Sequence, residues 1–79
     1  MKLAEAVGKR VQELLFEKKV TQYRLDKITC LNEKTIRDLI RGKTNDVNFS
    51  TIYLIADALH MSLIDFFSSP LFDKINIEI

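Results

Sequence analysis

Residues 21–42, TQYRLDKITCLNEKTIRDLIRG, carry the start and stop signals of two short helices. Thr21 and Asn32 are residue types that cap helix N-termini, and Gly42 is the type that ends a helix in a left-handed conformation. In the second half, apolar residues recur at three- and four-residue steps, the period of one helix face. The stretch therefore predicts three consecutive elements: a helix of about nine residues from Thr21, a turn at Cys30 and Leu31, and a helix from Asn32 to Arg41.

The signal that opens these helices, a polar N-cap with apolar residues one position before it and four positions after it, occurs four times. The four sets are Val20-Thr21-Leu25, Leu31-Asn32-Ile36, Phe49-Ser50-Leu54 and Met61-Ser62-Phe66. A further helix precedes them and runs to about Lys18, because apolar residues follow one stripe there: Leu3, Val7, Val11, Leu14 and Leu15. We therefore expect an all-α fold, a compact five-helix domain over residues 1–69.

The C-terminal tail, residues 70–79, has a different pattern. Ser68, Ser69 and Pro70 close the helical part, since proline cannot continue a helix, and apolar and polar residues then alternate as in a β-strand. A lone strand leaves its backbone groups unpaired. The tail is therefore a strand that pairs with another edge, a dimerisation arm, or a frayed end.

A homodimer is the expected state of the chain. A chain of 79 residues forms one domain with a modest core, and Phe16 points away from the apolar stripe of the first helix. The end of the chain also carries more apolar residues than a small core needs. These are Phe66, Phe67, Leu71, Phe72, Ile75, Ile77 and Ile79.

Charge is unevenly distributed along the chain, although the net charge is only +1. Residues 9–43 contain ten basic and five acidic residues, whereas residues 44–79 contain one basic and five acidic residues. Such asymmetry indicates one face that meets a polyanion. With 47% apolar and 29% charged residues, the composition is otherwise that of an ordinary globular domain.

The residue inventory excludes several classes of function. One cysteine, Cys30, and one histidine, His60, can form neither an internal disulfide nor a four-ligand zinc site. No nucleophile has a base at a fitting spacing, so we expect no enzyme, no cofactor and no small-molecule ligand. The sequence has no membrane-length apolar run and no leader pattern, which predicts a cytoplasmic protein without a membrane partner.

The helix expected over 32–41 has two unlike faces. Its apolar face consists of Ile36, Leu39 and Ile40, and the residues that point away are Lys34, Arg37, Asp38 and Arg41. A short helix of this kind fits the major groove of DNA, which is wide enough for one helix. In the alternative interpretation, residues four apart on this helix form surface ion pairs, Glu33 with Arg37 and Lys34 with Asp38.

From residue 7 to residue 67, the chain resembles the lambda-repressor-like helix-turn-helix regulators, also called the Xre type. The resemblance rests on six short runs: 21–25 (TQYRL), 34–36 (KTI), 41–43 (RGK), 50–52 (STI), 55–59 (IADAL) and 61–67 (MSLIDFF). It implies a five-helix domain, a bacterial or phage source, sequence-specific binding to a double-stranded DNA operator, and repression of transcription as a dimer. The alternative is a protein-interaction module built on the same scaffold.

The resemblance also implies which residues contact DNA. Those that reach base edges would be Glu33, Lys34, Thr35 and Asp38, with Arg37 at their margin. Those that contact phosphates would be Gln22, Tyr23, Arg41, Lys43, Thr44 and Asn45. For Gln22 a physical reason agrees, because the free N–H groups and the dipole at a helix start attract an anion.

Three residues depart from the pattern of the family. Cys30 stands where glycine is usual, and a non-glycine residue in a left-handed turn is strained by about 1 kcal/mol or more. Asp26 replaces a small apolar residue, so we expect the contact between the two helices to be looser or hydrogen-bonded. Ile40 replaces a glutamate. The two tyrosines, Tyr23 and Tyr53, are expected to pack half-buried with their hydroxyl groups in water.

Overall fold

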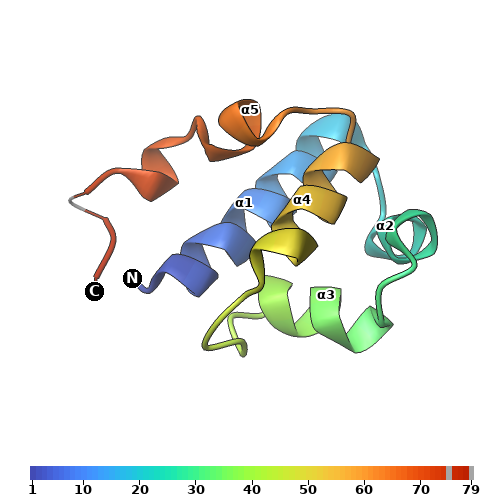
Figure 1. Cartoon of the computed structure of the whole chain (residues 1–79), viewed down its shortest axis with the longest axis horizontal. Helices are drawn as coiled ribbons and strands as arrows, with labels where there is room; N and C mark the ends of the chain where they lie inside the picture. The colour runs from blue at the N-terminus through green and yellow to red at the C-terminus, as the bar shows by residue number, and fades with distance from the viewer. Residues whose placement is uncertain (75, 79) are drawn as a thin grey trace.

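A computed structural model describes residues 1–74 and 76–78, and within them it confirms the all-α fold. Its helices are α1 (Leu3–Lys18), α2 (Gln22–Thr29), α3 (Glu33–Ile40), α4 (Phe49–Ala58) and α5 (Leu63–Phe67), followed by a short 3-10 helix (Pro70–Phe72). In Figure 1, α1 and α4 lie in the middle of the molecule, α3 lies below them, α5 lies above them, and α2 lies at one side. No helix within the described residues has the length and apolar character needed to cross a membrane.

Three of the four predicted helix starts are confirmed by side-chain caps. The Thr21 hydroxyl accepts a hydrogen bond from the backbone N–H of Arg24 at 3.1 Å, and the Asn32 side-chain oxygen accepts one from Lys34 at 2.9 Å. The Ser62 hydroxyl likewise accepts one from the N–H of Asp65. These bonds satisfy N–H groups that a helix start otherwise leaves without partners.

The predicted start of α4 is wrong by two residues. Asn48, not Ser50, is the N-cap residue, with an extended backbone at φ −69° and ψ 140°. Val47 stands before this cap and packs against the core that contains Ile52, so these two residues form the staple. Phe49, the predicted staple residue, is 64% exposed on the first turn of the helix. The helix thus starts where Val47 is partly buried against the core and Phe49 is left exposed.

Left-handed residues follow four of the helices. They are Lys19, Cys30, Gly42 and His60, with φ between 56° and 72°. The left-handed Gly42 is as predicted, and Cys30 adopts the conformation in which the family usually has glycine.

The core is a single cluster at the centre of the molecule. The largest fully buried side chains come from all five helices: Val7, Val11, Leu25, Ile36, Leu39, Ile55 and Phe66. The predicted stripe of α1 is confirmed at its centre but wrong at its start, where Leu3 is 53% exposed. Gly8, on the same helix, is buried beneath α3: a Cβ atom placed on it would overlap the carbonyl oxygen of Leu39 and lie 2.9 Å from the carbonyl carbon.

Arg10, in the middle of α1, holds the C-terminal end of α5. Its guanidinium donates from Nε to the carbonyl of Phe66 at 2.7 Å and from Nη2 to the carbonyl of Asp65 at 2.9 Å. A third donor reaches Glu13 at 3.0 Å. A cation at the C-terminal end of a helix satisfies free carbonyl groups and opposes the helix dipole.

The C-terminal tail returns to the start of the chain. The prediction that the helical part closes at Pro70 is wrong, because residues 70–72 form a further 3-10 turn. This turn places the ring of Phe72 4.9 Å from the ring of Phe67, measured between ring centroids. Further along, the N–H of Glu78 donates to the carbonyl of Met1 at 2.7 Å, and an isolated parallel bridge links Lys2 with Glu78. The two chain ends accordingly lie close together in Figure 1.

Three of the seven apolar residues predicted to serve dimerisation pack inside the domain. Phe66 is fully buried, and Phe67 and Phe72 pack against the core. Two of the residues predicted to contribute, Ile75 and Ile79, lie outside the described residues.

Candidate nucleic-acid interface

α3 has one face in the core and one in solvent. Ile36 and Leu39 are buried, whereas Glu33, Lys34 and Thr35 are exposed. Arg37 and Asp38 are partly exposed. Because the helix is fixed through its apolar face and its Asn32 cap, the polar side chains on the outer face project from a rigid base.

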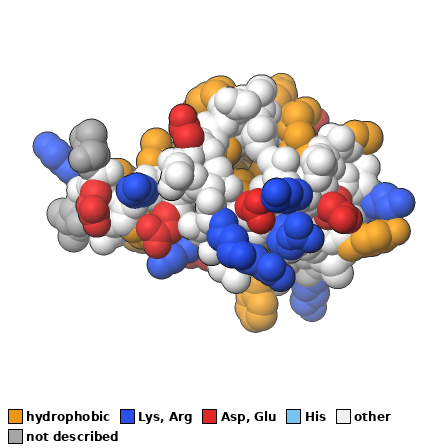
Figure 2. All heavy atoms as spheres, turned by 90° about the horizontal axis from the view of Figure 1, so that it is seen from below, with side chains coloured by type: hydrophobic (Ala, Val, Ile, Leu, Met, Phe, Trp, Pro, Cys, Tyr) orange, Lys and Arg blue, Asp and Glu red, His pale blue; other side chains and the backbone are white. Residues whose placement is uncertain are grey.

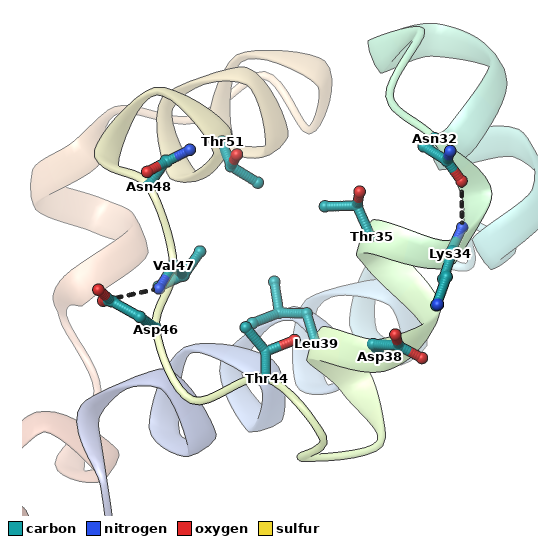
Figure 3. Close-up of a pocket in the computed structure, with 10 residues that line it drawn as sticks. All are labelled: Asn32, Lys34, Thr35, Asp38, Leu39, Thr44, Asp46, Val47, Asn48 and Thr51. Carbon is teal, nitrogen blue, oxygen red and sulfur yellow. Dashed lines mark hydrogen bonds between the residues drawn. The ribbon is translucent and has the colours of Figure 1, made fainter.

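A hollow of about 350 Å³ separates the outer face of α3 from the segment that leads into α4. We call it the α3–α4 hollow. Its polar lining residues are Asn32, Lys34, Thr35, Asp38, Thr44, Asp46, Asn48 and Thr51. In Figure 3 the side chains of Lys34, Thr35 and Asp38 stand on α3, across the hollow from Thr51 of α4 and from Asn48, the N-cap residue of that helix. The hollow therefore presents both hydrogen-bond donors and acceptors from two helices.

Four of the predicted DNA-contacting residues meet at this hollow: Lys34, Thr35, Asp38 and Thr44. The other predicted residues do not line it. Glu33 and Arg37 are on α3, Gln22 and Tyr23 open α2, and Arg41 and Lys43 follow α3. Asn45 lines a separate, largely apolar groove with residues at the starts of α1 and α4.

Asn48 is the residue at this surface that sequence reasoning missed. It is the N-cap of α4, yet its side chain makes no capping hydrogen bond, and it lines the α3–α4 hollow. Asp46 lines the hollow too, but its carboxylate accepts a hydrogen bond from the N–H of Val47 at 2.9 Å. The signal for Asn48 was present in the sequence as a second cap-type residue two positions before Ser50.

The charged side chains of α3 are not paired with one another. Over residues 1–74 and 76–78, ion pairs within 4.0 Å join only Arg10 to Glu13 and the Met1 amino group to Glu78. The alternative interpretation of α3 as a helix with two internal ion pairs is therefore not supported. Seen from the side of α3, Figure 2 shows Lys and Arg side chains gathered near the middle of the face, with Asp and Glu side chains among them.

Arg10 does not contribute to this basic face. Its three nitrogen donors are bound to α5 and to Glu13, and its side chain is only 12% exposed. The basic excess of residues 9–43 is therefore smaller at the surface than the sequence indicates.

The N-terminal end of α2 carries the predicted phosphate-contacting pair Gln22 and Tyr23. Gln22 is the first residue of the helix and is partly exposed. Tyr23 is 68% exposed, and the Lys27 ammonium lies 5.2 Å from the centre of its ring. The prediction of half-buried tyrosines is wrong, since Tyr53 is also 56% exposed.

The turn between α2 and α3 is stabilised by the side chain before Cys30. The Thr29 hydroxyl donates to the carbonyl of Leu25 at 2.8 Å and accepts from the N–H of Leu31 at 3.3 Å. The N–H of Cys30 itself donates to the carbonyl of Asp26. This local network offsets the strain of a left-handed cysteine and sets the direction in which α3 begins.

Asp26 is an unsatisfied group next to this turn. One of its carboxylate oxygens is buried and has no hydrogen-bond partner among the described residues. Burial raises the pKa of Asp26 above its ordinary value, the carboxylate of Glu33 raises it further, and the guanidinium of Arg37 opposes the change. This oxygen therefore makes no hydrogen bond between the two helices. Its burial disfavours the charged form of Asp26.

The described residues contain no cluster of three or more His, Cys, Asp and Glu side chains able to hold a metal ion. Cys30 is an exposed free thiol. The chemistry that this surface offers is hydrogen bonding and charge, from amide, hydroxyl, ammonium, guanidinium and carboxylate groups on and around α3.

Comparison with known proteins agrees with this geometry. The family model of the Cro/C1-type HTH DNA-binding domain matches residues 10–70, which is more than half of the chain. Searches of curated proteins and of solved structures gave no significant match. The matched segment contains α2, α3, the turn between them and the α3–α4 hollow. The chain therefore belongs to the Cro/C1-type HTH DNA-binding domain family.

Proposed function

We propose that this chain is a sequence-specific transcriptional regulator, acting as a repressor, that reads the major groove of DNA with α3. The observation that carries the proposal is the outer face of α3, where Lys34, Thr35 and Asp38 line the α3–α4 hollow. Neither Lys34 nor Asp38 forms an ion pair with another of the described residues. A side chain that is already paired would have to break that contact before it could read a base.

The residues at the tip and on the outer face of α3 contact the base edges. A lysine such as Lys34 donates to the O6 and N7 acceptors of guanine, and a carboxylate such as Asp38 accepts from N4 of cytosine. Thr35 and Glu33 lie beside them and complete the set, with Arg37 at its edge. Asn48 adds an amide across the hollow, and amides pair with the N6 and N7 edge of adenine.

Phosphate contacts flank the reading helix on both sides. Gln22 and Tyr23 stand at the N-terminal end of α2, where the helix dipole favours an anion. On the other side are Arg41, Lys43, Thr44 and Asn45, in the segment after α3. These contacts fix the position of the domain on the duplex and carry no sequence information.

The regulator acts as a homodimer on an operator with two half-sites. Two copies related by a two-fold axis would place their α3 helices about 34 to 36 Å apart, one turn of the duplex. Selection of bound duplexes from a random pool tests the function, because it measures DNA binding and reveals site symmetry together. Enrichment of a two-fold symmetric motif is expected, and a pool without enrichment would contradict the proposal.

A protein-interaction module is the second candidate, and the low net charge of +1 favours it. Salt dependence separates the two. Binding to DNA releases counterions and should weaken steeply as salt rises, whereas binding to a protein through apolar contacts should change little.

A further inference from the structure

Among the described residues, Thr51 is the one residue with a polar side chain that is buried as a whole. It lies in the first turn of α4 and is only 9% exposed, while the side chains of the core are otherwise apolar. Its backbone N–H donates to the carbonyl of Asn48 at 3.1 Å. Its hydroxyl has no hydrogen-bond partner within the described part of the chain. A hydroxyl removed from water without such a partner destabilises a folded protein, so its burial here requires an explanation.

The side chain of Thr51 reaches the α3–α4 hollow. In Figure 3, Thr51 of α4 and Thr35 of α3 point toward each other across this hollow. Thr35 and Asn48 are exposed and therefore stand at its rim, whereas the buried Thr51 stands at its floor. The hollow thus connects a buried hydroxyl with the surface proposed to meet DNA.

A water molecule suits this position better than a base edge does, because the groups at the rim keep a base away from the floor. The hollow has a volume of about 350 Å³, and one water molecule accounts for about 30 Å³ of the liquid. An ordered water needs roughly two to four polar partners. The hydroxyls of Thr51 and Thr35 provide two of them, and a base edge at the mouth of the hollow provides a third.

A bridging water of this kind carries sequence information. Ordered waters that link side chains to base edges contribute to specificity at protein–DNA interfaces. A base that presents the wrong group to the water leaves the bridge incomplete and the hydroxyl of Thr51 unsatisfied. Thr51 belongs to α4, and none of the residues predicted from the sequence to contact DNA lies on that helix.

We propose that Thr51 is a specificity-determining residue, whose hydroxyl holds a water in the α3–α4 hollow that hydrogen-bonds to the edge of one base pair. This role rests on the proposed function, since it requires α3 to lie in the major groove. It extends the reading surface to a side chain that α4 supplies. It also explains why a hydroxyl stands at a buried position that valine would fill equally well.

Thr51→Val tests the hydroxyl, because valine has nearly the same shape as threonine. On the duplex selected by the wild-type chain, the variant should bind about threefold to tenfold more weakly, the loss expected for one neutral hydrogen bond. Its affinity for random DNA should stay unchanged, and a new selection should show a relaxed preference at one base pair.

Two control variants isolate the hydroxyl in the hollow. Thr51→Ser keeps this hydroxyl and should retain both the affinity for the selected duplex and the base preference. Ser50→Ala removes an exposed hydroxyl from the neighbouring position, which does not line the hollow, and should leave the base preference unchanged.

Urea unfolding of the free chain separates recognition from a structural role. Thr51→Val removes a buried hydroxyl that has no partner among the described residues, so the midpoint of unfolding should stay the same or rise. A residue that merely held α4 in place would behave differently. Its replacement would lower the midpoint and weaken binding to selected and random DNA alike.

Three results would overturn the role of Thr51. The first is a valine variant with the affinity and base preference of the wild type. The second is a loss of preference with Thr51→Ser and not with Thr51→Val, which would assign the contact to the methyl group. The third is weaker binding to both duplexes together with a lower midpoint. A wild-type chain that enriches no duplex would contradict the proposed function, and this inference with it.

Discussion

Gly8 of α1 packs directly against the backbone carbonyl group of Leu39 in α3, so closely that no side chain fits between the two helices. The reading helix therefore rests on the backbone of α1 at this point as well as on side chains. Its position relative to the rest of the domain depends on the absence of a single methyl group.

Gly8→Ala should destabilise the domain and displace α3. Alanine favours a helix interior over glycine by about 1 kcal/mol, but the overlap with Leu39 should outweigh this and lower the free energy of unfolding by about 1 to 3 kcal/mol net. Urea unfolding followed by circular dichroism measures the change. Lys9→Ala, at the exposed neighbouring position, should stay within about 0.5 kcal/mol of wild type. Equal stability of the two variants would show that α1 and α3 do not approach this closely.

Arg10→Lys should loosen α5. An ammonium cannot make the forked contact by which the guanidinium binds the carbonyls of Asp65 and Phe66. We expect a loss of about 1 to 3 kcal/mol in the free energy of unfolding, with early amide exchange in α5. Glu13→Gln removes only the exposed ion pair and should lose no more than about 0.5 kcal/mol. If the lysine variant matched wild type, the assignment of Arg10 as the residue that holds α5 would be wrong.

Asp26→Asn should stabilise the protein at neutral pH and not in acid. The folded-state pKa of Asp26 is raised above its ordinary value of 3.8, so the folded protein holds this proton more tightly than the unfolded chain does. The free energy of unfolding of the wild type therefore falls as pH rises from 3.8 through the raised pKa, and it stays lowered at neutral pH.

The amide has no charge to bury, so its gain at neutral pH should reach up to about 1 kcal/mol and disappear below the ordinary pKa. Thermal unfolding across the acidic range measures this profile. Asp73→Asn, at an exposed position, is the matched control and should shift stability little at any pH. A gain that persists unchanged in acid would mean that the charge of Asp26 is not the cause.

Cys30→Gly should stabilise the turn that leads into α3. A left-handed cysteine is strained by about 1 to 2 kcal/mol, and glycine removes this strain. Glycine also gives the unfolded chain more conformational freedom, which lowers stability by about 0.4 to 1 kcal/mol. The free energy of unfolding should therefore rise by up to about 1 kcal/mol. Cys30→Ala keeps the strain and should leave the midpoint of denaturation nearly unchanged. A lower midpoint for the glycine variant would contradict the left-handed assignment.

The helix boundaries could be predicted wherever one local signal had no competitor. Thr21, Asn32 and Ser62 were each the only cap residue beside a suitable apolar pair, and all three caps are formed. The start of α4 offered two, Asn48 and Ser50. The choice between them depends on whether Val47 or Phe49 is buried, which the packing of distant helices decides.

The sequence predicts which site residues lie on α3, but not which residues other elements bring to the site. Helical periodicity is enough to place Lys34, Thr35 and Asp38 on the outer face. That Asn48 joins them depends on the approach of α4 to α3, and that Arg10 is bound to α5 depends on contacts 55 and 56 residues apart. Sequence spacing carries no information about either.

The central claim is that α3 reads the sequence while its flanks position the domain, and a comparison of Lys34→Ala with Lys43→Ala on DNA tests it most directly. Binding should be measured on the selected duplex and on random DNA, each over a series of salt concentrations. Lys34→Ala should reduce the binding free energy by roughly 1 to 3 kcal/mol on the selected duplex and by much less on random DNA. The variant should also lose its preference at one base pair. Lys43→Ala should weaken both duplexes alike and reduce the salt slope by about one unit. If both variants weakened both duplexes by the same factor, α3 would not be the reading helix.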